Sequence, residues 1–193
     1  NAVSQEPRKG GIQETREFLG SSLPGFLRDA LHQVASALPP GIDLASARTA
    51  VNARIVSLAG AHDLLTNRSW SGADVAEVVR RAMAPFAADQ VTLEGPSLDL
   101  SPKQALALSL ALHELATNAA KHGALVLSSG RIKLSWRQQG SFLVLEWSES
   151  GGPNVYVPSS RGYGMRVISA SIEQLGGEVK FDWQVEGLRC VLS

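Results

Sequence analysis

The amino-acid sequence predicts an α+β protein in which an N-terminal helical hairpin precedes an α/β sandwich with a mixed, largely antiparallel sheet. In the first part of the chain, apolar residues recur at spacings of three and four, which is the period of an amphipathic helix. Beyond residue 70, helical segments alternate with short stretches in which apolar and polar residues alternate, the pattern of half-buried strands. We therefore expect a linker over residues 1–11, a hairpin over residues 12–68 and an α/β domain over residues 70–193.

The composition is that of an ordinary globular protein. Of the 193 residues, 44% are hydrophobic and 19% are charged, and the formal net charge is +0. Because a neutral chain has no basic stripe, we expect no nucleic-acid partner. No apolar run reaches the roughly 20 residues of a membrane-spanning helix, so we expect no membrane segment in this chain. The single cysteine, Cys190, lies in an apolar run and is predicted to be a buried strand residue.

The predicted hairpin consists of two amphipathic helices. The first lies within Ile12–Leu38 and ends before Pro39-Pro40-Gly41. Asp43 is placed to cap the second, Leu44–Leu65. Each helix buries only one apolar stripe against its partner. The remaining apolar surface invites a second hairpin, so we expect a homodimer that forms a four-helix bundle.

The predicted α/β domain begins with a helix, a strand and a second helix. Asp74 is placed to cap a helix over about Val75–Pro85. A short strand, Gln90–Glu94, follows it. A capping-box signature at Ser101–Gln104 then begins a strongly apolar helix that continues to about Lys121.

The rest of the domain is predicted to be an antiparallel hairpin, a helix and two closing strands. The glycine pair Gly176-Gly177 is a C-cap signal for that helix. In chain order, these elements are the strands Arg131–Arg137 and Phe142–Trp147, the helix Met165–Leu175, and the strands Glu178–Trp183 and Leu188–Leu192.

A polar stripe interrupts the apolar helix near its end. Glu114, Asn118 and Lys121 fall within a narrow stripe at 100° per residue, and His113 and Thr117 flank it. A carboxylate, an amide and an ammonium group on the edge of an apolar helix need partners. A ligand site and a solvated helix face are the two interpretations of this stripe.

A second candidate segment is the run from Leu145 to Pro153. Glu149 is expected at a strand end, and Gly151 and Gly152 follow it. Glycine lets a ligand approach the main chain, so a carboxylate beside two glycines suits ligand binding. A plain hairpin turn is the alternative.

A third candidate segment is Gly162-Tyr163-Gly164, which opens the predicted helix at Met165. Free N–H groups at the positive end of a helix can cradle a phosphate. Arg161 or Arg166 could add charge-assisted hydrogen bonds to the same anion.

The order of these three segments resembles the GHKL ATP-binding fold, with its N, G1 and G2 boxes. The details resemble the HWE histidine kinases, which are named for a histidine in the N box and a Trp-x-Glu in the G1 box. Here these residues are His113 and Trp147-Ser148-Glu149. The run Ala61-His-Asp-Leu-Leu65 is similar to the end of the family's second hairpin helix, so the resemblance covers roughly Arg54 to the last residue.

The resemblance implies a pocket for ATP and Mg²⁺. Asn118 would hold the Mg²⁺ ion, Glu114 would orient a metal-bound water or polarise the acceptor, and Lys121 would neutralise phosphate charge. Glu149 would accept a hydrogen bond from the exocyclic amine of adenine. The implied nucleotide-binding set is His113, Asn118, Lys121, Trp147, Glu149, Gly151, Gly152, Arg161, Gly162 and Gly164.

The candidate phosphoacceptor is His32. A nucleophilic imidazole must be presented on the first hairpin helix, and Asp29 stands three residues before His32, as in the family's acceptor box. That box usually continues Arg-x-Lys-Asn, whereas this chain has Gln33, Ala35 and Ser36 there. Two interpretations stay open. Either His32 accepts the phosphoryl group, or the hairpin is degenerate and does not autophosphorylate.

The function that the resemblance implies is that of a bacterial two-component sensor histidine kinase core. Such a chain would be a cytoplasmic fragment of a longer sensor protein and would pass phosphate to an aspartate on a response-regulator receiver domain. The alternative is a regulator of a two-component pathway that binds ATP without autophosphorylation. A different GHKL class, such as a chaperone-like ATPase, would not account for His113 or for Trp147-Ser148-Glu149.

Overall fold

The structure is a computed structural model that describes residues 72–86, 88–159 and 162–193. The predicted linker and hairpin, which include His32, lie outside the described residues, as does Arg161. The described elements are β1 (Ala73–Asp74), α4 (Val75–Met83), the 3₁₀ helix η1 (Ala88–Gln90), β2 (Val91–Glu94), β3 (Asp99–Leu100), α5 (Pro102–Lys121), the 3₁₀ helix η2 (Ala124–Val126), β4 (Arg131–Gln139), β5 (Phe142–Ser150), α6 (Tyr163–Glu173), β6 (Val179–Gln184) and β7 (Gly187–Leu192).

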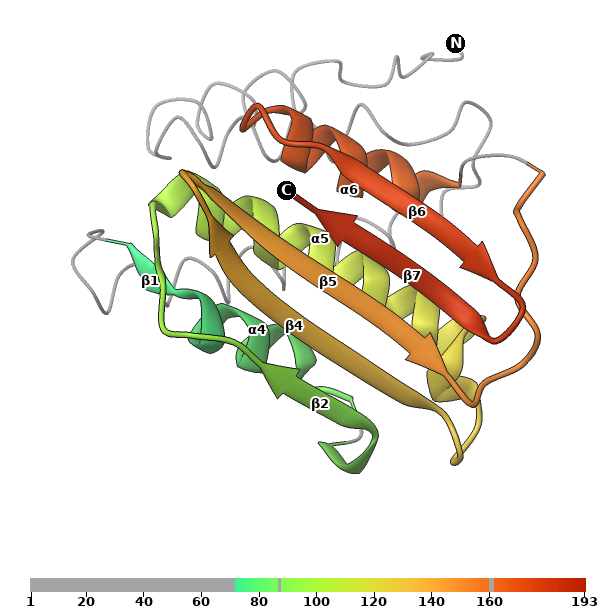
Figure 1. The fold of residues 1–193 in the computed structure, drawn as a ribbon. Coiled ribbons are helices and arrows are strands. Elements are labelled where there is room, and N and C mark those ends of the chain that lie inside the picture. The colour runs from blue at the N-terminus through green and yellow to red at the C-terminus, as the bar shows by residue number, and fades with distance from the viewer. Residues whose placement is uncertain (1–71, 87, 160–161) are drawn as a thin grey trace, which may run out of the picture.

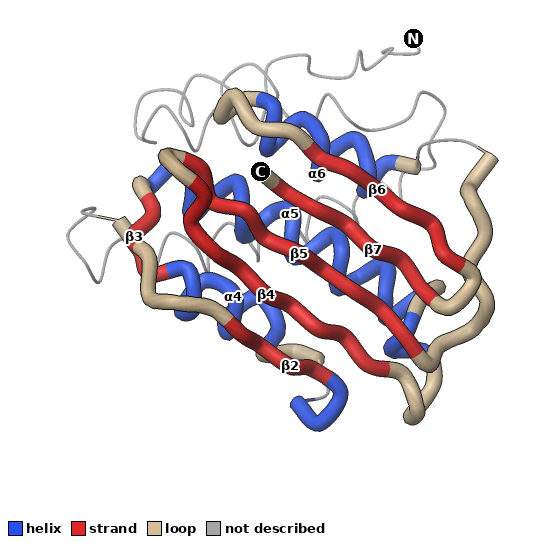
Figure 2. The backbone as a smooth tube through the Cα atoms, in the orientation of Figure 1, coloured by secondary structure: helices blue, strands red, loops and turns tan. Residues whose placement is uncertain are grey.

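One sheet and one layer of helices form the α/β part of the chain. The main sheet has the strand order β2-β4-β5-β7-β6. β2 runs parallel to β4 and the other neighbouring pairs are antiparallel, which confirms the predicted mixed, largely antiparallel sheet. Helices α4, α5 and α6 lie on one face of this sheet (Figures 1 and 2). A separate ladder of β1 and β3 was not predicted, because two-residue strands are too short to show alternation.

Alternation along the strands places the core on the helix-covered face. In β4, Ile132, Leu134 and Trp136 are buried, whereas Lys133 and Arg137 are exposed. Successive strand side chains point to opposite faces, so the other face of the sheet is charged and solvated. Each fully buried side chain of the size of Leu or Ile stabilises the fold by about 1.5–3 kcal/mol.

Helix α5 runs through the middle of this core. Twelve of its 20 residues are buried, and Glu114 is the single ionisable residue among these twelve. The helix packs against both α4 and α6 while its other side faces the sheet. None of the helices in the described part of the chain is long and apolar enough to cross a membrane.

The predicted caps are present at the starts of α4 and α5. Ser101 N donates to Gln104 Oε1 at 2.9 Å and Ser101 Oγ accepts from Gln104 N, which completes the capping box. Asp74 Oδ1 accepts from Ala76 N at 2.8 Å, and Asp74 Oδ2 accepts from Ser97 Oγ at 2.6 Å. The Ser97 hydroxyl and the backbone amides of the first turn lower the pKa of Asp74, against the opposing effect of burial.

Two boundaries differ from the prediction where the candidate site is built. β5 extends through Ser150, because its ladder with β4 continues to the pair Arg131↔Ser150. Glu149 therefore lies inside a strand rather than beyond its end. α6 begins at Tyr163 rather than Met165, so Gly164 belongs to the first turn of the helix and not to the loop before it.

Cys190 is fully buried in β7, as predicted. Burial raises the pKa of its thiol to about 12, so the thiol stays protonated at neutral pH. Since the thiolate is the reactive form, Cys190 acts as a packing residue.

The cap of α4 can be tested with Asp74→Ala. The substitution should lower the free energy of unfolding by about 1 kcal/mol near neutral pH, because two amides of the first turn lose their acceptor. The pKa of Asp74 is depressed in the folded state, so its contribution is present above the ordinary value of 3.8 and is lost as the pH falls through its lower, folded-state value. The difference in the free energy of unfolding between wild type and Asp74→Ala should therefore disappear at low pH.

Urea unfolding at several pH values measures this difference, with Asp74→Asn as the control. Asparagine keeps the side-chain oxygen that accepts from the helix amides, so this variant should retain most of the stability without the pH dependence. Equal stability of wild type and Asp74→Ala at pH 7 would show that the cap contributes nothing.

Candidate functional site

The candidate site is a cavity at the C-terminal end of α5. Its volume is about 480 Å³, within the range of roughly 300–1,000 Å³ that small-molecule sites occupy. Its walls come from α5, the end of β5, the segment 154–158, the start of α6, and β6 and β7. Four residues of the predicted set line it: Asn118, Glu149, Gly162 and Gly164.

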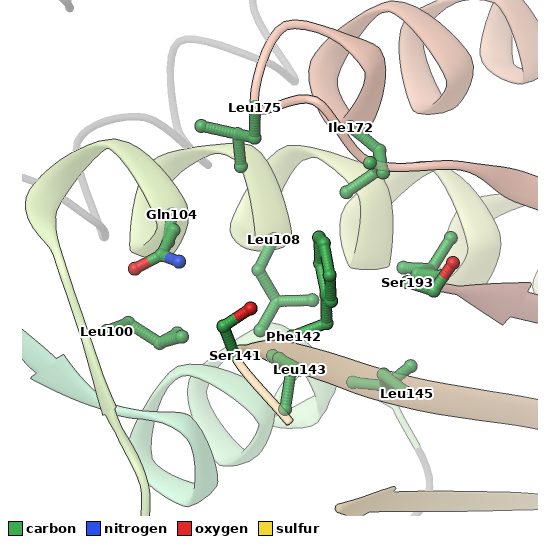
Figure 3. A pocket seen from close by; sticks show the side chains of 12 residues that line it. Leu100, Gln104, Leu108, Ser141, Phe142, Leu143, Leu145, Ile172, Leu175 and Ser193 are labelled. Atoms are coloured by element: carbon green, nitrogen blue, oxygen red, sulfur yellow. The ribbon is translucent and has the colours of Figure 1, made fainter. Parts of the chain in front are cut away.

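A second hollow lies at the opposite end of α5 (Figure 3). Its volume is about 90 Å³, too small for a nucleotide, and no charged side chain lines it. Figure 3 shows apolar side chains of α5, α6 and β5 around it, among them Leu108, Ile172 and Leu143. The cavity at the C-terminal end of α5 therefore has both the size and the polar groups that a nucleotide requires.

Glu149 is held in the cavity wall by two hydrogen bonds. The indole Nε1 of Trp147 donates to Glu149 Oε1 at 2.9 Å, and the backbone N of Ala124 donates to Glu149 Oε2 at 2.8 Å. Only 5% of Glu149 is exposed. Gly123 allows this approach, since a Cβ atom there would overlap Glu149 Oε2. The end of β5 is thereby tied to the turn that follows α5.

Burial also sets the protonation of this carboxyl group. Desolvation raises the pKa of Glu149, and the hydrogen bonds from Ala124 and Trp147 oppose the rise. Above the ordinary carboxyl pKa of 4.5, the folded chain therefore holds this proton more tightly than the unfolded chain. The contribution of Glu149 to stability becomes less favourable as the pH rises from that value through the folded-state pKa.

Glu114, Asn118 and Gly164 meet where α5 and α6 approach each other. A Cβ atom at Gly164 would lie 2.8 Å from Glu114 Oε2 and 3.3 Å from Asn118 Nδ2. The space that this glycine leaves is thus bounded by a carboxylate and a carboxamide. The structure brings together residues from two segments that are more than 40 residues apart in the sequence.

These groups have the chemistry of a Mg²⁺ site that is completed by a ligand. In the described ranges, no group of three or more His, Cys, Asp or Glu is placed to hold a metal ion. Mg²⁺ in phosphate-binding sites usually takes one or two protein oxygen ligands, and water and phosphate oxygens supply the rest. Asn118 Oδ1 and Glu114 Oε2, which face the space at Gly164, fit such a nucleotide-borne ion.

Other residues of the predicted set do not line the cavity. Lys121 is exposed at the end of α5, and His113 is partly buried. Gly151 and Gly152 have a packing role, because Cβ atoms there would lie 2.6 Å from the carbonyl oxygen of Ser129 and from the Cα of Ala124, respectively. Their approach to a base, and the roles of Lys121 and His113, stay predictions.

Several lining residues were not predicted. His122 at the end of α5, Tyr156 in the loop before α6, and Phe181, Trp183 and Leu188 on the last two strands also line the cavity. The three strand residues were predicted only as parts of the two closing strands, because their alternation is that of any half-buried strand. The sequence signal that could have distinguished these cavity residues from core residues is the excess of large aromatic side chains near one strand end.

The indole hydrogen bond to Glu149 can be tested with Trp147→Phe. Loss of a donor to the charged carboxylate should raise the pKa of Glu149 further. The free energy of unfolding should fall by about 1–3 kcal/mol, because a buried oxygen loses a partner. Carboxyl-carbon NMR over a pH series reports the pKa, and thermal unfolding reports the stability.

Trp136→Phe is the matched control, because the indole of Trp136 donates to the carbonyl of Pro96 at 2.8 Å, at the edge of the sheet away from the cavity. This variant loses the same kind of bond and should leave the titration of Glu149 unchanged. An identical titration of Glu149 in wild type and Trp147→Phe would refute the proposed coupling.

Known proteins resemble this chain in sequence and in fold. The sequence pattern of the HWE histidine kinase family matches residues 34–97. A blue-light-activated histidine kinase of Rhizobium johnstonii is 36% identical over 163 residues, which are 83% of this chain and 46% of that protein. The blue-light-activated histidine kinase 1 of Erythrobacter litoralis is 35% identical over 148 residues, 72% of this chain and 41% of that protein. The chain thus spans less than half the length of these two relatives.

Solved structures show the same fold at low sequence identity. The histidine kinase domain from the Erythrobacter litoralis EL346 blue-light activated histidine kinase aligns with a TM-score of 0.59 and 14% identity, over 86% of this chain and 94% of that one. A structure of the Erythrobacter litoralis EL346 blue-light activated histidine kinase aligns with a TM-score of 0.68 and 14% identity, over 98% of this chain and 61% of that one. From the motifs, the fold and the related sequences together, we conclude that this chain belongs to the HWE histidine kinase family.

Proposed function

We propose that this chain binds ATP with Mg²⁺, transfers the γ-phosphoryl group to His32 of its hairpin, and passes it to an aspartate on a response-regulator receiver domain. The observation that carries the proposal is the meeting of three separate sequence segments around one cavity. These segments contribute Glu149, Asn118 and Gly164 to the lining, and Glu114 lies beside Gly164 without lining the cavity.

Glu149 is suited to recognise the base of the nucleotide. Each of its two oxygens accepts one hydrogen bond from the protein, and each carboxylate oxygen has a second lone pair. A carboxylate held in this way can accept a hydrogen bond from the exocyclic amine of adenine without rearrangement. Both protein donors favour the ionised form of Glu149, which is the acceptor, and oppose the rise in pKa that burial causes.

The start of α6 is suited to the phosphates. Gly162 occupies the N-cap position of α6 and, as a glycine, contributes no side-chain cap. The positive end of a helix favours an anion. Asn118 stands beside Gly164 at this place and would hold the ion, and Glu114 lies next to it. When bound, Mg²⁺ would supply charge neutralisation at the phosphate oxygens.

Phosphoryl transfer asks the protein mainly for position and charge complementarity. In the proposed step, a ring nitrogen of His32 forms a bond to the γ-phosphorus, the bond between that phosphorus and the bridging oxygen breaks, and ADP leaves with the electron pair. We propose that Glu114 polarises the acceptor or orients a metal-bound water. A homodimer through the hairpin would present His32 to the cavity.

A regulator without autophosphorylation is the second candidate. The residues that favour it are Gln33, Ala35 and Ser36, which replace the usual basic and amide residues after the acceptor histidine. Such a chain would still bind ATP through Glu149 and Asn118 and would act on a partner's phosphorylation.

Incubation of the purified chain with γ-labelled ATP and Mg²⁺ separates these candidates. We expect label that is labile in acid and stable in base, as for phosphohistidine, and no label in His32→Gln. Label that persists in His32→Gln would assign the acceptor elsewhere. Nucleotide binding without any label would support the regulator.

A pair of glycine substitutions tests the phosphate end of the cavity. Gly164→Ala should weaken Mg²⁺–ATP binding at least tenfold. The new methyl carbon would lie 2.8 Å from Glu114 Oε2 and 3.3 Å from Asn118 Nδ2, so both side chains would have to move. Gly140→Ala, in the turn between β4 and β5, is the control, since a Cβ atom there has nothing within 4 Å and Gly140 does not line the cavity. Isothermal titration calorimetry gives both dissociation constants, and equal constants would argue against a phosphate site at Gly164.

A further inference from the structure

Two aromatic side chains of β6, Phe181 and Trp183, line the cavity together with Glu149 and Asn118. Both point toward the core, and both are only partly buried. Their rings are stacked, with centroids 6.2 Å apart and an interplanar angle of 19°. Two aromatic rings that keep part of their surface exposed to a cavity provide a flat, apolar wall for a ligand.

The register of the sheet places this wall relative to Glu149. Trp183 pairs with Leu188 between β6 and β7, and Ser148 pairs with Arg189 between β5 and β7. Because the two strands are antiparallel, the next residues along, Glu149 of β5 and Leu188 of β7, lie opposite each other. Glu149, Leu188 and Trp183 form one row across three neighbouring strands, and all three line the cavity. Since neighbouring strands lie about 4.8 Å apart, Trp183 stands roughly 10 Å from Glu149.

This spacing suits the nucleoside part of a nucleotide. A base whose amine is hydrogen-bonded to Glu149 extends over Leu188, and its far edge or its ribose then reaches Trp183. The face of an indole ring carries partial negative charge, so it favours a flat ring or C–H groups and disfavours phosphate. The phosphates are thereby directed toward the start of α6, where Gly164 lies beside Asn118.

We propose that Trp183, supported by Phe181, is a further nucleotide-contacting residue whose indole packs against the nucleoside part of ATP. The inference rests on the proposed function of the cavity. Phe181 acts through Trp183, because its stacked ring limits the orientations that the indole can adopt.

Calorimetric titration of the purified chain with Mg²⁺–ATP tests this contact. Trp183→Ala should bind about tenfold more weakly, in line with the loss of one stacked base. Trp183→Phe keeps an aromatic face and should retain most of the affinity. Phe142→Ala is the matched control, because Phe142 is 58% exposed beside the other hollow and its loss should leave ATP binding unchanged.

Tryptophan fluorescence gives a second, independent readout. ATP should quench the emission of the wild-type chain, and the quench should largely disappear in Trp183→Phe while calorimetry still detects binding. The fluorescence experiment with Trp183→Phe still tests the proposal if circular dichroism shows that Trp183→Ala is unfolded.

Wild-type affinity in a folded Trp183→Ala variant, or a full quench in Trp183→Phe, would overturn the proposal. These results differ from a failure of the proposed function itself. If the proposed function were wrong, the wild-type chain would not bind Mg²⁺–ATP at all, and the proposed contact at Trp183 would be refuted together with it.

Discussion

The burial of α5 is the constraint on which the rest of the described structure depends. The helix is enclosed by the sheet and by α4 and α6, so its residues must be apolar along most of its length. Polar side chains such as Asn118 are accommodated where this packing opens, at the C-terminal end of the helix. The same packing that stabilises the fold therefore keeps most of the buried residues of α5 apolar, and the cavity lies at the C-terminal end, where the packing opens.

Glu149 connects this helix to the sheet. A buried carboxylate is costly unless its oxygens are paired, and here the donors come from two different elements. The Trp147 indole belongs to the same strand, whereas the Ala124 amide belongs to the turn after α5. The carboxylate thus positions the strand end and the helix end together, and a ligand that accepts this geometry meets groups that are already oriented.

Much of the fold was predictable because its signals are local. The capping box at Ser101 and the cap at Asp74 depend on residues a few positions apart, and both are present. The positions of β1 and β3 were missed, because a pair of two-residue strands is held by its partner and not by its own pattern. The end of β5 was placed too early, because its ladder with β4 holds Ser148 and Ser150 in the strand despite their polarity.

The sequence by itself determined the fold class, the three motif segments and the family to which the chain belongs, since these depend on periodicity and on residues close together in the chain. Only the tertiary structure decided which residues share one cavity. It placed Gly164 against Glu114 and Asn118, and it aligned Trp183 with Glu149 across two strand spacings. The physical reason is that strand register and helix packing join residues far apart in sequence, and no local pattern records those distances.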